Sequence, residues 1–193
     1  VFASPCQALV LAAGRGERMR PLTDATPKPL LPVRGKPLMQ WAMEGLQRAG
    51  VTDVIINTAW LGEQIAAHFG VSFKGADAEA LRLQYSHEGA DFGGALETAG
   101  GIVRALPHLA DVFWVVAGDV YAPQFEFSNE VRERFAQSPQ LAHLWLVPNP
   151  PHNTAGDFGL SPEGLALNLP KPKTPSADDA PRYTFSTMAL YKQ

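Results

Sequence analysis

A pair of glycines and a cluster of positive charges follow an apolar segment near the start of the chain. Residues 8–12 are small and apolar, as in a buried strand, and Gly14 and Gly16 come directly after them. Small residues let backbone N–H groups approach an anion closely, and consecutive N–H groups in such a loop form an anion-binding concavity. The same stretch supplies four full positive charges, which suit a polyphosphate better than a single carboxylate: Arg15, Arg18, Arg20 and Lys28. It predicts a polyphosphate site; the alternative is an ordinary strand-to-helix turn with a solvated basic face.

Two better-known phosphate loops do not match this stretch. A dinucleotide-binding loop needs a third glycine where Met19 stands. A P-loop needs Gly-Lys followed by Ser or Thr, whereas the pair Gly35-Lys36 is followed by Pro37. The first mismatch argues against a nicotinamide oxidoreductase. The loop must bind phosphates in another way.

A carboxylate follows a second apolar segment. Residues 112–117 are predicted to form a buried strand, and Gly118 then lets the backbone turn so that Asp119 can point into a cleft. A carboxylate beside a polyphosphate is a natural ligand for Mg²⁺, which would neutralise phosphate oxygens and stabilise charge on the transferred group. The alternative is a turn-forming Asp that satisfies its own backbone.

Two adjacent glycines interrupt a predicted helix in the segment Glu97–Gly101. Gly100 and Gly101 are locally unfavourable inside a helix. Their presence indicates the close approach of a flat ligand or of backbone. Helix packing is the alternative explanation.

Strand-like and helix-like segments alternate along the first part of the chain. Apolar runs predict strands at 8–12, 54–57, 81–85, 112–117 and 142–147, and helical spacing predicts helices at 37–49, 61–69, 95–106 and 127–137. This alternation favours a mostly parallel sheet covered by helices on both faces. Ligands bind such sheets beyond the carboxyl ends of the strands, where the glycine loop and Asp119 both lie.

Prolines become frequent after residue 147, and no long helical pattern follows. The segments 157–160 and 165–169 read as a hairpin, 171–181 as a loop, and 183–191 as a last strand.

Composition limits the classes of partner. The chain has 193 residues, a formal net charge of −3 and one cysteine. These values are typical of one globular domain and argue against a general nucleic-acid binder. A single cysteine excludes an internal disulfide and favours the cytoplasm, and no apolar run approaches a membrane span. The oligomeric state is not predicted.

The loop and the residues after it resemble the signature of the sugar-1-phosphate nucleotidyltransferases. That signature reads Gly-x-Gly-x-Arg, then Pro-x-Thr, then Pro-Lys-Pro-Leu-Leu-Pro-Val. Here these elements are Gly14 to Arg18, Pro21 to Thr23, and residues 27–33. The resemblance covers nearly the whole chain and is strongest over 9–43, 97–101 and 118–119.

The resemblance implies an α/β, Rossmann-like, three-layer, glycosyltransferase-A-like fold with a mixed, mostly parallel sheet. It implies one domain over 1–193, with a nucleotide-binding core at about 1–147 and a sugar-binding part at about 148–193. The implied reaction is Mg²⁺-dependent transfer of a nucleoside monophosphate from a nucleoside triphosphate to a sugar 1-phosphate, with release of pyrophosphate. The attacking phosphate is already anionic, so no general base is needed.

The resemblance also implies roles for particular residues. Arg18 grips the leaving phosphates, Lys28 contacts the α-phosphate and the sugar phosphate, and Asp119 holds Mg²⁺. The implied nucleotide contacts are Leu11, Ala12, Ala13, Gly14, Arg15, Gly16, Glu88, Thr98 and Gly100. The implied sugar contacts are Asn149, Gly156, Asp157 and Ser186.

Within the family, the sequence of residues 11–23, 57–62 and 183–186 is most similar to that of bacterial N-acetylmuramate-1-phosphate uridylyltransferases, which make UDP-N-acetylmuramate during cell-wall recycling. We therefore expect UTP as the nucleotide. The alternatives are a mannose-1-phosphate guanylyltransferase, a glucose-1-phosphate uridylyl- or thymidylyltransferase, and a non-catalytic nucleotide-sugar-sensing module of the same fold.

The sequence departs from the family pattern at two places. Residues 89–94 resemble a small insertion beside the base pocket. The family also carries a second magnesium-binding Asp in a Trp-x-Asp-Val/Ile-Gly segment beyond the last strand. No such segment occurs before Gln193, and Asp178 and Asp179 stand in a different context. We therefore expect a C-terminally truncated chain whose activity is impaired without that ligand.

Overall fold

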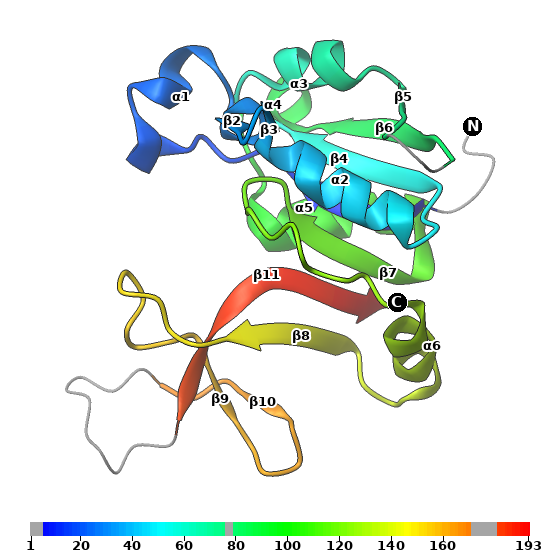
Figure 1. Ribbon diagram of the computed structural model, residues 1–193, viewed down its shortest axis with the longest axis vertical. Coiled ribbons are helices and arrows are strands. Elements are labelled where there is room, and N and C mark those ends of the chain that lie inside the picture. The colour runs from blue at the N-terminus through cyan, green and yellow to red at the C-terminus, as the bar shows by residue number, and fades with distance from the viewer. Residues whose placement is uncertain (1–5, 76–78, 171–180) are drawn as a thin grey trace.

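Four parallel strands form the centre of the molecule. The computed structural model describes residues 6–75, 79–170 and 181–193. The strands lie in the order β7 (Leu109–Ala117), β1 (Cys6–Leu11), β4 (Asp53–Thr58) and β6 (Leu81–His87). Figure 1 labels β7, β4 and β6 of this set. All four carboxyl ends therefore meet at one edge.

Both faces of the parallel sheet are buried at β1 and β7, which is why residues 8–11 and 112–117 are apolar at every position. On β1, Ala8 and Val10 point into the core on one face and Leu9 into the core on the other. On β7, Trp114 packs on the same face as Ala8 and Val10, and Phe113 packs on the same face as Leu9. Alternate side chains of a strand point to opposite faces, so a strand buried on both sides needs apolar residues at every position.

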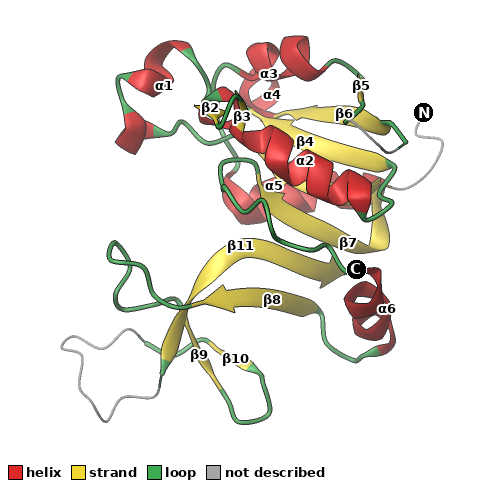
Figure 2. Cartoon of the chain, viewed as in Figure 1, coloured by secondary structure: helices red, strands yellow, loops and turns green. Residues whose placement is uncertain are grey.

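Helices cover the two faces of the sheet. Helices α2 (Leu38–Arg48) and α3 (Gly62–Phe69) pack against the face that carries Trp114, and α5 (Glu97–Ala105) packs against the other. Figure 2 shows α2 in front of the sheet and α5 behind it. Helix α6 (Asn129–Gln137) begins after Ser128, whose hydroxyl accepts a hydrogen bond from the N–H of Val131 at 3.2 Å, an N-cap that satisfies an end donor.

Antiparallel strands extend the sheet on the β7 side. The long strand β11 (Arg182–Lys192) pairs with β7, with β8 (Ala142–Val147) and with β9 (Phe158–Leu160), which forms a hairpin with β10 (Ala166–Leu167). Its register with β8 shifts between Phe185 and Ala189, where Thr187 has a φ of 65°. Such a bulge bends the strand that carries it, here β11.

The predicted fold class is confirmed: parallel strands form the centre of a mixed sheet with helices on both faces. The predicted strands and helices all occur, with small differences at their ends, and so does the hairpin. The predicted loop 171–181 lies outside the described residues except for its last residue.

Several short elements were not predicted. They are α1 (Leu22–Ala25), α4 (Glu88–Phe92), β5 (Ser72–Phe73), the hairpin of β2 (Pro32–Val33) and β3 (Lys36–Pro37), and the 3₁₀ turns η1 (Glu17–Met19), η2 (Lys28–Leu30) and η3 (Leu106–His108). Such elements are too short for periodicity to reveal them. Among the described residues, no helix has the length and apolar character needed to cross a bilayer.

Candidate active site

A cavity of about 1010 Å³ lies at the carboxyl ends of the parallel strands. Its wall combines the loop after β1, the residue that follows Gly118, the loop after β4, the α4–α5 region and part of β11. Nine of the predicted site residues line it: Leu11, Ala12, Ala13, Gly14, Arg15, Gly16, Lys28, Thr98 and Asp119. This volume lies at the upper end of the range for small-molecule and cofactor pockets.

The glycine loop is held from beneath by a buried threonine. Gly16 has a φ of 67°, and a Cβ there would lie 3.0 Å from Cγ2 of Thr23 and 3.2 Å from Cβ of Lys28. The Thr23 side chain is fully buried and its hydroxyl donates a 2.9 Å hydrogen bond to the carbonyl of Gly16. Only glycine fits this left-handed, crowded position without strain. By contrast, a Cβ on Gly14 would meet nothing within 4 Å, so Gly14 leaves its backbone open to a ligand.

The arginines after the loop occupy different environments. The Arg15 guanidinium lies 3.3 Å from the ring centre of Trp60 and donates to the carbonyl of Thr23 at 3.1 Å and to Asp24 at 3.3 Å. Arg20 also binds Asp24, at 2.8 Å. Arg18 is exposed, does not line the cavity, and makes no hydrogen bond or ion pair within the described part of the chain.

The predicted phosphate-binding lysine and the predicted metal ligand are in direct contact. Nζ of Lys28 lies 2.7 Å from Oδ2 of Asp119, and both side chains are partly exposed to the cavity. Gly118 allows this placement because its N–H donates to the carbonyl of Leu11 at 2.8 Å, and a Cβ there would lie 3.2 Å from that oxygen and from the side chain of Met39. A larger residue at position 118 would push the end of β7 away from β1. The glycine therefore lets the two strand ends lie close together, with Asp119 beside Lys28.

Glu88 does not reach the cavity wall. Its side chain is fully buried; Oε1 accepts from Nδ2 of Asn57 at 2.8 Å and Oε2 from the N–H of Leu96 at 2.8 Å. Asn57 in turn accepts from the N–H of Ala12 at 2.7 Å. In this structure Glu88 therefore braces the glycine loop and the start of α5 rather than facing a ligand.

Packing of α5 against β4 and α4 accounts for Gly101, and crowding at the start of the helix itself accounts for Gly100. A Cβ on Gly101 would lie 2.7 Å from Nδ2 of Asn57 and 2.8 Å from Oε1 of Glu88, and one on Gly100 would lie 2.8 Å from Cβ of Leu96. Both glycines lie outside the cavity lining, whereas Thr98 is part of it.

The predicted sugar contacts form a cluster of their own beside the cavity. Asn149 donates to the carbonyl of Arg182 at 3.0 Å, and Asp157 accepts from the N–H of Phe185 at 3.0 Å. Gly156 is buried with a φ of 61°, and Ser186 accepts from the N–H of Met188 at 3.3 Å. None of the four lines the cavity; the neighbours of Ser186, Phe185 and Thr187, do.

Several lining residues were not predicted as site residues. Among them are Asn57, Trp60, Leu61, Glu63, Glu97, Phe185, Thr187 and Tyr191. The residues from Asn57 to Glu63 lie at and after the carboxyl end of β4, at the edge where the glycine loop lies, and that position is the signal that could have found them. Burial raises the pKa of the Tyr191 hydroxyl.

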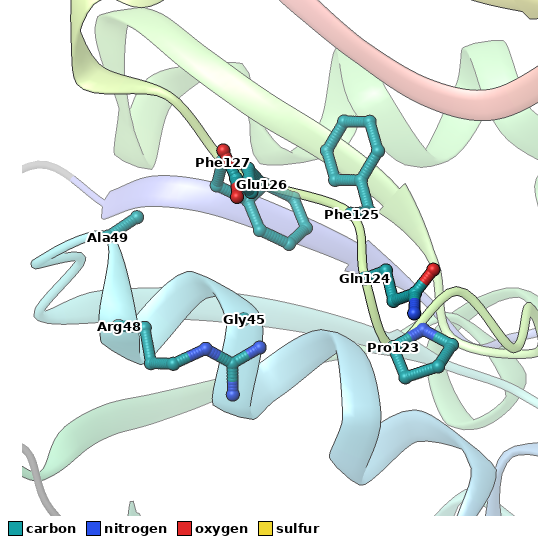
Figure 3. Close-up of a pocket in the computed structure, with 8 residues that line it drawn as sticks. All are labelled: Gly45, Arg48, Ala49, Pro123, Gln124, Phe125, Glu126 and Phe127. Carbon is teal, nitrogen blue, oxygen red and sulfur yellow. The ribbon is translucent and has the colours of Figure 1, made fainter.

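A second, smaller hollow of about 400 Å³ lies between α2 and the segment 123–127. Figure 3 shows its lining residues on these two elements, among them Gly45, Arg48 and Phe127. A Cβ on Gly45 would lie 2.7 Å from the Phe127 ring. The hollow shares no lining residue with the larger cavity and contains none of the predicted site residues.

The carboxylate at the cavity wall suits a metal ion that also binds the phosphates of a ligand. Within the described residues, no group of three His, Cys, Asp or Glu side chains could hold a metal ion without help. Asp119 supplies one carboxylate at the cavity wall. Mg²⁺ is commonly held by one or two carboxylates with the remaining positions on water and substrate phosphates, so the site fits a magnesium ion that enters with a nucleotide. Asp178 and Asp179 lie outside the described residues.

A family model and several proteins of known function are similar to this chain. A family model described as "Nucleotidyl transferase" matches residues 7–191. The chain is 45% identical over 192 residues to an N-acetylmuramate alpha-1-phosphate uridylyltransferase of Neisseria meningitidis serogroup B, covering 96% of this chain and 75% of that protein. It is 37% identical over 128 residues to the mannose-1-phosphate guanylyltransferase catalytic subunit beta of Drosophila pseudoobscura pseudoobscura, covering 65% of this chain and 33% of that protein.

A solved structure supports the fold. The crystal structure of HddC from Yersinia pseudotuberculosis superposes with a TM-score of 0.67, covering 97% of this chain and 76% of that one. The sequence identity is 18%, so this likeness concerns the fold alone.

Proposed function

Because the chain belongs to the nucleotidyl transferase family, we propose that it transfers a uridylyl group from UTP to N-acetylmuramate 1-phosphate, forming UDP-N-acetylmuramate and pyrophosphate. The observation that carries the reaction class is the contact of Lys28 with Asp119 on the wall of a cavity that also contains the glycine loop. The 45% identity to a uridylyltransferase supports the choice of UTP and sugar. On this proposal the protein acts in cell-wall recycling in the cytoplasm.

The proposed chemistry is an in-line substitution at the α-phosphorus of UTP. An oxygen of the sugar phosphate forms a new bond to that phosphorus, and the bond to the bridging oxygen of the β-phosphate breaks, so that pyrophosphate leaves with the electron pair. The attacking oxygen is already anionic and no proton has to be removed. The protein contributes alignment and charge neutralisation.

Different residues at and beside the cavity supply the alignment and the charge neutralisation. The backbone of Ala12 to Gly16 offers N–H groups to the phosphates, and Arg15 and Lys28 add positive charge at the wall. Arg18, which is exposed beside the loop, is the proposed ligand of the leaving β- and γ-phosphates. Asp119 would hold Mg²⁺, which supplies charge neutralisation at the phosphates when bound.

The sugar is proposed to bind on the side formed by β11. Phe185 and Thr187 line the cavity there. Asn149 and Asp157 hold the neighbouring backbone through the contacts at Arg182 and Phe185. In this proposal residues 1–147 bind the nucleotide and 148–193 bind the sugar.

The test is a panel of UTP, GTP and TTP against N-acetylmuramate, mannose and glucose 1-phosphates, with pyrophosphate detection and mass analysis of the product. The expected result is the highest kcat/KM for UTP with N-acetylmuramate 1-phosphate, and loss of turnover in Asp119→Asn. A preference for GTP with mannose 1-phosphate would replace the assignment by a guanylyltransferase. Tight nucleotide binding without Mg²⁺-dependent turnover would indicate a sensing module.

A further inference from the structure

Trp60 is a large aromatic residue on the cavity wall that core packing does not explain. It lies in the turn between β4 and α3, two residues after the carboxyl end of β4, and lines the cavity. Among the described residues, the hydrophobic clusters on the two faces of the sheet include Trp114 and Trp145 but not Trp60. Its size must therefore be explained by what it contacts at the site.

The Trp60 side chain contacts two residues of the segment that contains the glycine loop. Its indole N–H donates a 2.9 Å hydrogen bond to the carbonyl of Thr23. The face of its ring carries the Arg15 guanidinium, 3.3 Å from the ring centre. The same Thr23 carbonyl accepts from Nη1 of Arg15 at 3.1 Å, so both lone pairs of that oxygen are used. The hydrogen bond fixes the ring, and the ring supports the guanidinium.

This arrangement leaves most donors of Arg15 unused. A guanidinium has five N–H groups in one plane. Within the described residues, one of them binds Thr23 and one binds Asp24 at 3.3 Å, and the others have no protein partner. Asp24 is also bound by Arg20, at the shorter distance of 2.8 Å. Because Arg15 lines the cavity, it offers charge and free donors to an anion there.

The strand order places Trp60 and Asp119 on opposite sides of the glycine loop. The loop follows β1, which lies between β7 and β4; Asp119 follows β7 and Trp60 follows β4. In the proposed reaction, Lys28 and Asp119 mark the position of the α-phosphate. A triphosphate bound there can extend its remaining phosphates across the loop toward Arg15.

Support from a ring matters for binding because an arginine side chain is flexible. Fixing its rotatable bonds costs free energy, and a side chain that is fixed before the ligand arrives does not add that cost to binding. Arg15 is fixed by its stack on Trp60. Arg18, in the exposed segment 17–22, has no such support among the described residues.

We propose that Trp60 is a positioning residue for the β- and γ-phosphates of the nucleotide. The Thr23 carbonyl orients the ring, and the ring holds Arg15 with its free N–H groups available to these phosphates. The inference rests on the proposed function because it takes UTP as the ligand.

The experiment measures binding of UTP, UMP and inorganic pyrophosphate by calorimetry, with Mg²⁺ and without a sugar phosphate, so that no turnover is needed. The readout is the Kd of UMP divided by the Kd of UTP, in which the nucleoside and the α-phosphate cancel. Arg15→Ala should lower this ratio about 10- to 100-fold and Trp60→Leu about 3- to 10-fold. Trp60→Phe, which keeps a ring but not the N–H, should fall between Trp60→Leu and the wild type. Pyrophosphate binding should weaken in the same order.

A double variant tests whether Trp60 acts through Arg15. The ratio for Arg15→Ala with Trp60→Leu should equal that of Arg15→Ala within about twofold, because no guanidinium remains for the ring to hold. Gln64→Ala is the matched control. Gln64 also contacts the segment after the loop, by a 3.1 Å hydrogen bond from Nε2 to the carbonyl of Ala25, but it does not line the cavity. Its removal should leave the ratio unchanged, whatever happens to the unfolding midpoint.

The outcomes separate this inference from the proposed function. A ratio in Trp60→Leu equal to that of the wild type overturns the role of Trp60, even where turnover is rapid. Fully multiplicative losses in the double variant also overturn it, because Trp60 would then act without Arg15. Binding of UTP and pyrophosphate that depends on Trp60, without turnover on any sugar phosphate, supports this inference and contradicts the proposed function. Preference for GTP contradicts the proposed nucleotide, and the pyrophosphate measurement then decides the role of Trp60.

Discussion

Lys28 and Asp119 are 91 positions apart in the chain, and their side chains meet at 2.7 Å on the wall of the large cavity. Lys28 begins the turn η2, and Asp119 follows the carboxyl end of β7. The charged groups of Lys28 and Asp119 therefore lie in contact beside the glycine loop. A change at either residue must alter the electrostatic environment of the other.

This contact predicts that the two residues act as a unit. Lys28→Met and Asp119→Asn should each lower kcat/KM by a factor on the order of 10²–10³, the size of effect seen when one group that stabilises transition-state charge is removed. The double variant should lose much less than the product of the two single losses. Steady-state pyrophosphate release measures all four proteins. Strictly multiplicative losses would show that the residues act independently.

A buried hydrogen-bond chain predicts a large effect from an isosteric change. Both carboxylate oxygens of Glu88 accept from donors, Nδ2 of Asn57 and the N–H of Leu96. Glu88→Gln places an amide donor against one of them, and Asn57 cannot turn over without losing its bond from the N–H of Ala12. The free energy of unfolding should fall by about 1–3 kcal/mol in urea titrations.

An exposed asparagine provides the control for this change. Asn129 donates one hydrogen bond to the carbonyl of Ala49 near the surface, and Asn129→Ala should cost about 1 kcal/mol or less. A Glu88→Gln protein as stable as the wild type would mean that the buried chain is not under this constraint.

The start of β4 predicts a dependence of stability on acid. Two hydrogen bonds from Arg82, each 2.6 Å long, hold the pKa of the Asp53 carboxyl below its ordinary value, with a further contribution from the hydroxyl of Thr52. Because the folded-state pKa is lowered, the stabilisation is complete above the ordinary pKa of 3.8 and is lost as the pH falls through the lower folded value.

Asp53→Asn should therefore be less stable than the wild type at pH 7, by about 1–3 kcal/mol, and the difference should shrink below about pH 4. Urea unfolding at a series of pH values measures it. A difference that stays constant down to pH 2 would exclude Asp53 as the titrating group.

The sequence predicted the elements better than the partners of their side chains. Apolar residues at every position of 8–11 and 113–117 identify strands buried on both faces, because that pattern depends only on each strand itself. The role of Glu88 depends on Asn57 and Leu96, which come from two other elements, so no local pattern reveals whether its carboxylate faces a ligand or the core. In the sequence, the adjacent glycines of α5 indicated that some group lies close to the helix, but they did not indicate whether that group is a ligand or another part of the protein.

Arg15 and Arg18 also differ in contacts that the sequence does not reveal. The sequence gives both the same charge beside the same loop, yet the Arg15 guanidinium is held by Trp60, Thr23 and Asp24, and that of Arg18 has no partner in the described part of the chain. Arg18→Ala should lower kcat/KM for the nucleotide by about 10- to 100-fold and leave the unfolding midpoint unchanged.

Arg15→Ala should lower both quantities, because it removes a cation–π contact and two hydrogen bonds as well as a charge at the cavity, with a loss of about 1–2 kcal/mol in stability. Trp60→Leu should also lower stability while retaining the positive charge, because it removes the same cation–π contact and the 2.9 Å hydrogen bond from Nε1 of Trp60 to the carbonyl of Thr23. Kinetics and thermal unfolding of the three variants test this division. Equal unfolding midpoints for Arg15→Ala and Arg18→Ala would show that the contacts of Arg15 do not stabilise the loop, and that both arginines serve only the bound phosphates.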